Sequence, residues 1–201
     1  MMRIYKQETS KSCGVACLRS AFNHYGNDYS EKDIWAKHNS FKELNPIISL
    51  GLTALKFGFE VVYMGYNPVI VNNNKYPKDL KKSLKIKSKK YFNYGKFIVD
   101  TSLEFLDRKG RIIENKLSLN KIKSLIEKEK FIIINVKPAF ITGRGLVDMN
   151  HKVIVYGYNN NGFNILNPSD ATEEIWDFDS FLLAFYAAVP ELLIIRKKKK
   201  I

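Results

Sequence analysis

The sequence predicts an α+β fold in which N-terminal helices pack on a C-terminal antiparallel sheet. Apolar residues recur at spacings of three and four in the first 60 residues, which indicates helices, whereas the last 50 residues contain short apolar runs and a turn, which indicate strands. Of the 201 residues, 45% are hydrophobic, enough for one core. We therefore expect one domain over residues 1–201, with a lysine-rich insertion or long loop at about 67–96 and a basic tail at 196–201.

The first predicted helix runs from about Cys13 to Tyr25. Its apolar residues recur at helical spacing. Gly26 suits the left-handed position that often follows a helix, and Ser10 or Ser12 can cap the helix start. The local sequence therefore places Cys13 at the start of a helix.

Two more helices and a strand are predicted before the lysine-rich segment. Ser30 and Asp33 have the spacing of a capping box, which opens a short second helix. An Asn-Pro pair opens a third helix over residues 45–58. The apolar run at 59–64 then predicts a buried strand.

The middle of the chain has the weakest pattern. Residues 67–96 contain asparagines, two prolines and many lysines, and we expect an irregular surface loop that the core does not need. Residues 96–100 and 104–113 read as strands, the second interrupted by a turn at 108–110.

The C-terminal half predicts one helix and a series of strands. Ser118 caps the helix, whose apolar residues line one face. The predicted strands are 131–137, 151–158, 163–168, 173–178 and 191–197. The second and third of these strands are joined by "NNNG", which is typical of a β-hairpin.

The net charge of +13 comes from two places. Residues 75–96 contribute +8 and the tail "RKKKK" at 196–200 contributes +5, so the rest of the chain is neutral. Solvated lysine is the simpler interpretation, and weak contact with an anionic partner is the alternative. A non-catalytic basic module that binds nucleic acid or an acidic membrane surface through these lysines is the corresponding functional hypothesis.

The sequence predicts a cytoplasmic protein without an integral membrane segment. Residues 1–12 lack the apolar stretch of a secretory signal. The longest apolar run, 181–195, is interrupted by Pro190 and Glu191 and is shorter than the roughly 20 residues that a membrane span needs. Two cysteines and three histidines lack zinc-site spacing, and "GRG" at 143–145 is not a dinucleotide fingerprint, so we expect no metal or cofactor.

Cys13 has the position of an activated nucleophile. Unpaired N–H groups and the helix dipole at a helix start favour an anion, which lowers the pKa of a thiol. Gly14 follows and is expected to leave room for a substrate backbone. Cys17 lies one turn further on, where we expect a small core residue.

The C-terminal hairpin supplies candidate partners for this thiol. His151 begins one strand and Asn167 lies near the end of the other, so folding the hairpin brings both to the same end. An amide oxygen on the imidazole would fix its tautomer and direct the other nitrogen at sulfur. The amide of Gln7, six residues before Cys13, is a candidate oxyanion donor together with the Cys13 backbone N–H, and one such donor lowers a barrier by about 3 kcal/mol.

Gln7 with "CGVACL" and "NHKVIVYGYNNNGFNILNP" resembles the papain-like cysteine peptidases of family thirty-nine. That family includes the proteolytic domains that remove double-glycine leader peptides in bacteriocin-exporting ABC transporters. The resemblance implies a papain-like fold, a peptide or protein substrate, and four roles: Cys13 as nucleophile, His151 as base, Asn167 as the residue that orients it, and Gln7 as oxyanion donor.

The chain departs from the family pattern at three positions. Ser12, Asn150 and Asn167 stand where family members commonly have Asp, Gly and Asp. These departures bear on rate and substrate and leave the Cys–His pair intact. We expect a cysteine peptidase that cleaves a peptide or isopeptide bond through a Cys13 acyl-enzyme. A papain-like acyltransferase with the same triad is the alternative, because these residues do not distinguish water from an amine acceptor.

Overall fold

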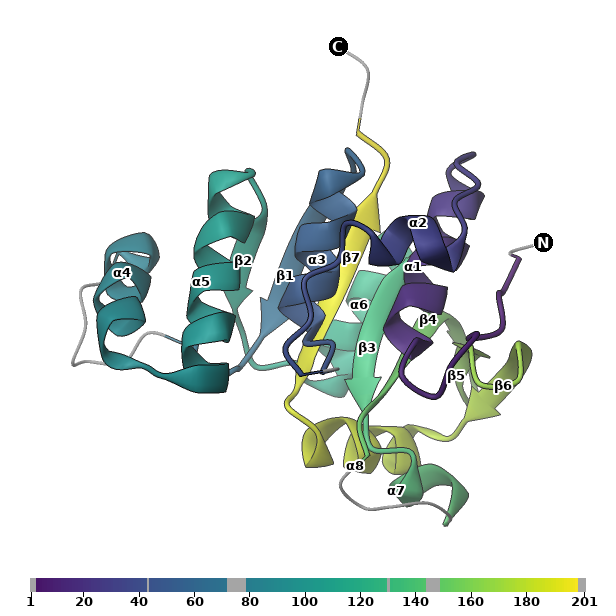
Figure 1. Cartoon of the computed structure of the whole chain (residues 1–201). Coiled ribbons are helices and arrows are strands. Elements are labelled where there is room, and N and C mark those ends of the chain that lie inside the picture. The colour runs from purple at the N-terminus through teal and green to yellow at the C-terminus, as the bar shows by residue number, and fades with distance from the viewer. Residues whose placement is uncertain (1–2, 43, 72–78, 130, 144–148, 199–201) are drawn as a thin grey trace.

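The computed structural model describes residues 3–42, 44–71, 79–129, 131–143 and 149–198. One seven-stranded sheet runs through the molecule in the order β2-β1-β7-β3-β4-β5-β6 (Figure 1). Its strands are β1 (Glu60–Gly65), β2 (Arg111–Glu114), β3 (Ile132–Val136), β4 (His151–Asn159), β5 (Gly162–Asn167), β6 (Thr172–Trp176) and β7 (Glu191–Arg196).

Most neighbouring strands of the sheet are antiparallel, as predicted. The last strand, β7, lies between β1 and β3 and is antiparallel to both. The β1–β2 pair is parallel, with Val62 opposite Arg111. A parallel pair needs a long crossover connection, and the segment between these two strands contains two helices.

Helices cover both faces of the sheet. They are α1 (Cys13–His24), α2 (Glu31–Trp35), α3 (Ile47–Lys56), α4 (Leu80–Lys90), α5 (Asn93–Asp107), α6 (Leu119–Lys128), α7 (Ala139–Thr142) and α8 (Phe178–Ala187). Helices α1, α3 and α5 bury apolar residues against one face, and α6 and α8 bury theirs against the other. The predicted α+β class, with the helix that begins at Cys13 packed on the sheet, is therefore confirmed. Figure 1 shows α4 and α5 at the β2 end of the sheet and β6 at the opposite end.

The helix starts predicted from capping residues agree with the structure. Ser30 and Asp33 form the predicted capping box at α2, and Ser118 caps α6 by accepting from the Lys121 N–H. Ser12 is the N-cap residue of α1, but its side chain makes no capping hydrogen bond and instead bonds the backbone of Thr9. The first N–H groups of α1 therefore lack a side-chain cap.

Two predictions for the middle of the chain are wrong. The irregular loop predicted over 67–96 is helical from Leu80 onward, where Asp79 caps α4 by accepting from the Lys82 N–H. The strands predicted at 96–100 and 104–107 belong to α5, because Ile98, Ser102 and Phe105 recur at helical spacing and are buried. Only the part from Arg111 is a strand. Residues 72–78, also in the predicted loop, lie outside the described residues, as do residues 144–145 of "GRG" and 199–200 of the tail.

Gly14 has a different role from the one predicted. A Cβ at this position would lie 2.4 Å from Leu50 Cδ1 on α3. The missing side chain therefore accommodates the close packing of α1 against α3, on the core side of the helix. This contact does not support the expectation that Gly14 leaves room for a substrate backbone.

Candidate active site

Cys13 lies in a cleft of about 540 Å³ at one end of the central strands. The start of α1, Lys42, residues 44–47 and residues 67–69 form its walls, together with Tyr94 of α5. The end of β3 and the starts of β4 and β7 contribute Asn135, Lys152 and Glu191. Segments from across the chain thus converge on the predicted nucleophile.

The Cys13 thiol is buried and hydrogen-bonded by His151. Burial is the largest single influence on its pKa and raises it. The His151 hydrogen bond, the charges of Lys152 and His151, and a hydrogen bond with the Lys152 backbone together outweigh burial and lower the pKa from 9.0 to about 7. A substantial fraction of the thiol is therefore ionised near neutral pH.

His151 links the thiol to Asn167. Its Nε2 lies 2.9 Å from Asn167 Oδ1 and 3.3 Å from Ser169 Oγ. Nδ1 is therefore the ring nitrogen left for Cys13. Burial, the largest influence, lowers the pKa of His151, but the bonds to Cys13 and Asn167 and the Cys13 charge raise it overall. The raised imidazole pKa and the lowered thiol pKa both favour a thiolate–imidazolium pair.

The hairpin brings His151 and Asn167 together as the sequence indicated. His151 is the first residue of β4 and Asn167 is the last residue of β5. The pairing of the two strands shifts by one residue between Val155 and Gly157, and Ile154 pairs with Leu166 beyond that shift. This shift in register could not be read from the sequence. It sets the two side chains within hydrogen-bond distance.

The sequence prediction missed Glu174 on β6. Its Oε1 accepts from Asn167 Nδ2 at 2.8 Å, which leaves Asn167 Oδ1 directed at His151. Thr172 Oγ1 and Trp176 Nε1 donate to the two oxygens of the same carboxylate at 2.8 and 2.6 Å. The alternation of Thr172, Glu174 and Trp176 along the strand was the available signal, because it places all three on one face.

Gln7 lies next to the hairpin but does not line the cleft. Its backbone N–H donates to the Pro168 carbonyl at 2.8 Å, and its Nε2 donates to the Thr9 carbonyl at 2.9 Å. One of the two Nε2 hydrogens is therefore engaged and the other is left. The oxyanion role of Gln7 stays a prediction.

Cys17 has the environment expected of a core residue. It is 1% exposed, and its Sγ donates to the Lys152 carbonyl at 3.4 Å. Burial, followed by the charge of Cys13, raises the pKa of this thiol well above 9.0. The two cysteines, one turn apart, therefore differ strongly in thiolate content at neutral pH.

One lysine of the lysine-rich segment supports the cleft wall. Lys87 of α4 is 1% exposed, and its Nζ donates to the carbonyls of Val69, Ile70 and Val71 at 3.0, 3.3 and 2.6 Å. Val69 lines the cleft. The segment that the sequence presented as dispensable therefore holds part of the site, and lysine composition alone gave no sign of it.

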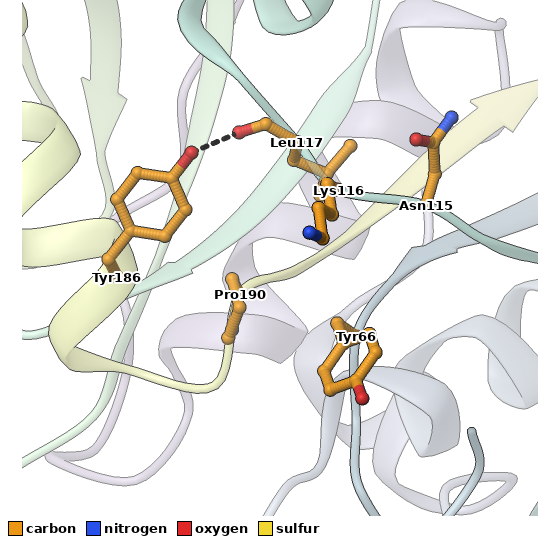
Figure 2. Close-up of a pocket in the computed structure, with 6 residues that line it drawn as sticks. All are labelled: Tyr66, Asn115, Lys116, Leu117, Tyr186 and Pro190. Carbon is orange, nitrogen blue, oxygen red and sulfur yellow. Dashed lines mark hydrogen bonds between the residues drawn. The ribbon is translucent and has the colours of Figure 1, made fainter. Parts of the chain in front are cut away.

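A second, smaller pocket of about 270 Å³ shares no lining residue with the cleft. Figure 2 shows its residues, with the Tyr186 hydroxyl donating to the Leu117 carbonyl at 2.7 Å. It is lined by Tyr66, Asn115, Lys116, Leu117, Tyr186 and Pro190. These side chains include neither a cysteine nor a histidine.

The structure offers no candidate for metal chemistry within its described residues. No group of three or more His, Cys, Asp or Glu side chains lies close enough there to hold an ion. The described helices are each too short or too polar to cross a bilayer.

Comparison with known proteins finds one family model and several solved structures that are similar to this chain. A sequence model of the Peptidase C39 family matches residues 2–83. No curated protein sequence was found to match. The part of the resemblance that rests on the Gln–Cys segment is thus supported by an independent match, which includes Gln7 and Cys13 and does not extend to the hairpin.

Solved structures with the same fold cover nearly the whole chain. The peptidase domain of Streptococcus ComA, a bifunctional ABC transporter involved in quorum sensing, aligns with a TM-score of 0.57 and 15% identity over 98% of this chain and 100% of that one. A double-glycine motif protease from an AMS/PCAT transporter, in complex with its leader peptide, aligns with a TM-score of 0.55 and 13% identity over 98% and 93%. A putative C39-like peptidase from Bacillus anthracis gives 0.52 and 12% over 99% and 96%.

These findings confirm the resemblance to C39 peptidases and the papain-like fold. The family match covers residues 2–83, and the shared fold extends over nearly the whole chain. They do not assign roles to individual side chains.

Proposed function

We propose that this chain, which shares its fold with C39 peptidase domains, is a cysteine peptidase that cleaves peptide bonds through a Cys13 acyl-enzyme. One observation carries the proposal: His151 bonds Asn167 Oδ1 at 2.9 Å through Nε2 and also bonds the Cys13 thiol. In a nucleophile–base–orienting triad the base must contact both other members at once. Cys13 at the start of α1 and the hairpin pair are built to do this.

The reaction proceeds in two halves. His151 takes the Cys13 proton, and the thiolate forms a bond to the substrate carbonyl carbon. The imidazolium then gives its proton to the leaving amine as the C–N bond breaks, which leaves a thioester on Cys13. In the second half His151 takes a proton from water, whose oxygen attacks the thioester, and the proton returns to the Cys13 sulfur as the acid product leaves.

The start of α1 supplies stabilisation for the oxyanion of each tetrahedral intermediate. Its first N–H groups have no side-chain cap and carry the positive end of the helix dipole. The Cys13 backbone N–H is the first donor. The remaining Nε2 hydrogen of Gln7 is the second, which it supplies after a side-chain rotation toward the cleft.

Glu174 acts through Asn167 as a positioning residue. Its bond to Asn167 Nδ2 fixes the orientation of the amide. Many family members have an Asp at the position of Asn167, and here the residue that bonds Asn167 carries a carboxylate instead. A negative charge that is linked to the imidazole through Asn167 favours the imidazolium form of His151. This arrangement supplies charge that the Asn at position 167 lacks.

The proposal is tested by digesting a mixture of defined peptides and reading new termini by mass spectrometry. Cys17→Ala is the matched control for Cys13→Ala, because both remove a thiol from the same helix. Wild type and Cys17→Ala are expected to give the same products, and Cys13→Ala none. Cleavage by Cys13→Ala, or none by wild type, contradicts the proposal. An added amine that appears in the products would assign the same thioester to acyl transfer instead of hydrolysis.

A further inference from the structure

The cleft contains a cation, Lys152, for which the mechanism above has no role beyond its effect on the pKa of Cys13. Lys152 follows His151 on β4, is 8% exposed and lines the cleft together with Cys13. Its side chain lies on the same face of the sheet as Ile154, two residues on, which packs in the core under α1. The ammonium is therefore held by a rigid strand, on the side of the sheet where the nucleophile lies.

Within the described ranges Lys152 Nζ makes neither a hydrogen bond nor an ion pair, and its charge acts over a longer distance on the Cys13 thiol and on the Glu191 carboxylate. Glu191 carries the one carboxylate among the described cleft-lining residues, and its Oε2 accepts from Tyr63 Oη at 2.6 Å and Asn67 Nδ2 at 3.3 Å instead. Asn135, which pairs with Lys152 across β3 and β4, also has a buried Oδ1 without a partner among the described residues.

An ammonium that lines the cleft beside a nucleophile and has no ion-pair partner in the described part of the chain presents a site for an anion, because a low-dielectric cleft concentrates the field of its charges. Because Lys152 and Cys13 line the same cleft, an anionic group of a peptide bound at the nucleophile can reach the ammonium.

We infer that Lys152 is a substrate-binding residue that receives a carboxylate next to the scissile bond, so that the cleft selects acidic peptides. The inference rests on the proposed function, in which Cys13 is the nucleophile. The carboxylate is supplied either by the C-terminus of a peptide cleaved close to its end or by an Asp or Glu side chain. Both sources present the same chemistry to the ammonium.

The first test compares two alkylating agents that differ in one charged group, iodoacetate and iodoacetamide. The rate of each at Cys13 is measured in wild type, Lys152→Met and Lys152→Arg. Lys85→Met is the matched control, since it removes an exposed lysine of α4 that does not line the cleft. The rate ratio of iodoacetate to iodoacetamide is expected to fall about tenfold in Lys152→Met, and to stay at the wild-type value in the other two variants.

The ratio separates substrate binding from an effect on the thiol itself. If Lys152 only stabilised the thiolate, both reagents would slow equally and the ratio in Lys152→Met would equal that of wild type, which would overturn the inference. The labelling needs no peptide cleavage. A protein that labels with the expected preference but cleaves nothing would contradict the proposed function and leave Lys152 as an anion site, whereas an active peptidase with an unchanged ratio would overturn only the role of Lys152.

The second test distinguishes the sources of the carboxylate with three sets of acetylated hexapeptides. One set has a free C-terminus, one has a C-terminal amide and a Glu scanned through each position, and the third has Gln in place of that Glu. Wild type is expected to cleave the first or the second set at least tenfold faster than the third, and the faster set names the source. Lys152→Met should remove the difference. Equal rates for all three sets in wild type would overturn the inference.

Discussion

Removing the His151 imidazole should return the Cys13 thiol toward ordinary acidity. The pKa of Cys13 is about 7 because the hydrogen bond and charge of His151, with Lys152, outweigh burial. In His151→Ala the burial and the Lys152 contributions remain and the imidazole contribution is lost, so we expect the thiol pKa to rise toward 9. At pH 7 the thiolate fraction is about one half for a pKa of 7 and about 1% for a pKa of 9, so alkylation of Cys13 should slow by about 50-fold.

The assay follows iodoacetamide labelling between pH 5 and 10. Cys13 and Cys17 lie on one tryptic peptide, residues 12–19, and fragmentation within it assigns the label to each thiol. Because the reactive form is the thiolate, the wild-type rate should rise through a midpoint near pH 7, and the variant rate through a midpoint that moves toward pH 9. His24→Ala, at the exposed end of the same helix, is the control. A midpoint that stays near 7 in His151→Ala would refute the coupling of the two groups.

Three further substitutions test the supports of the site. Glu174→Gln keeps the size of the side chain but removes its charge, so the pKa of His151 should fall. The alkaline limb of the kcat/KM profile should then move to lower pH, with about tenfold lower activity. An unchanged alkaline limb would exclude an electrostatic role for Glu174. Gly14→Ala places a Cβ 2.4 Å from Leu50 Cδ1 and should lower the free energy of unfolding in urea by about 1–3 kcal/mol. Additional Leu50→Ala should then cost less than it does alone. Lys87→Met should raise KM severalfold with kcat nearly unchanged, because the carbonyls of residues 69–71 lose their donor and Val69 lines the cleft. Equal KM values in Lys87→Met and Lys85→Met would contradict this.

The parts of the site that the sequence could predict are those set by local rules. Cys13 at a helix start followed from helical spacing and the glycine beyond the helix, and the Asn-Gly turn brought His151 and Asn167 to one end of a hairpin. Each of these features depends on residues close in sequence. The strand interpretation of 96–100 failed for the same reason: its β-branched residues favour a strand locally, but burial of the Ile98–Phe105 face against the core decides for a helix.

The parts that the sequence could not predict depend on pairings between distant segments. Lys87 is one of nine lysines in residues 75–96, and nothing local separates it from the eight others. Its burial follows from how α4 packs near residues 69–71. The same holds for Gly14, whose function depends on Leu50 of another helix, and for Glu174, whose partner on β5 is set by the register of β5 with β6.

Trapping the acyl-enzyme tests the central claim most directly. Wild type is mixed with an acetyl-peptide p-nitrophenyl ester, quenched in acid within the first turnover, and analysed by intact mass and by fragmentation of residues 12–19. The account predicts one added acyl group, on Cys13, which is absent from Cys13→Ala and fails to accumulate in His151→Ala. An acyl group on Cys17, or product released with Cys13 never modified, would contradict it.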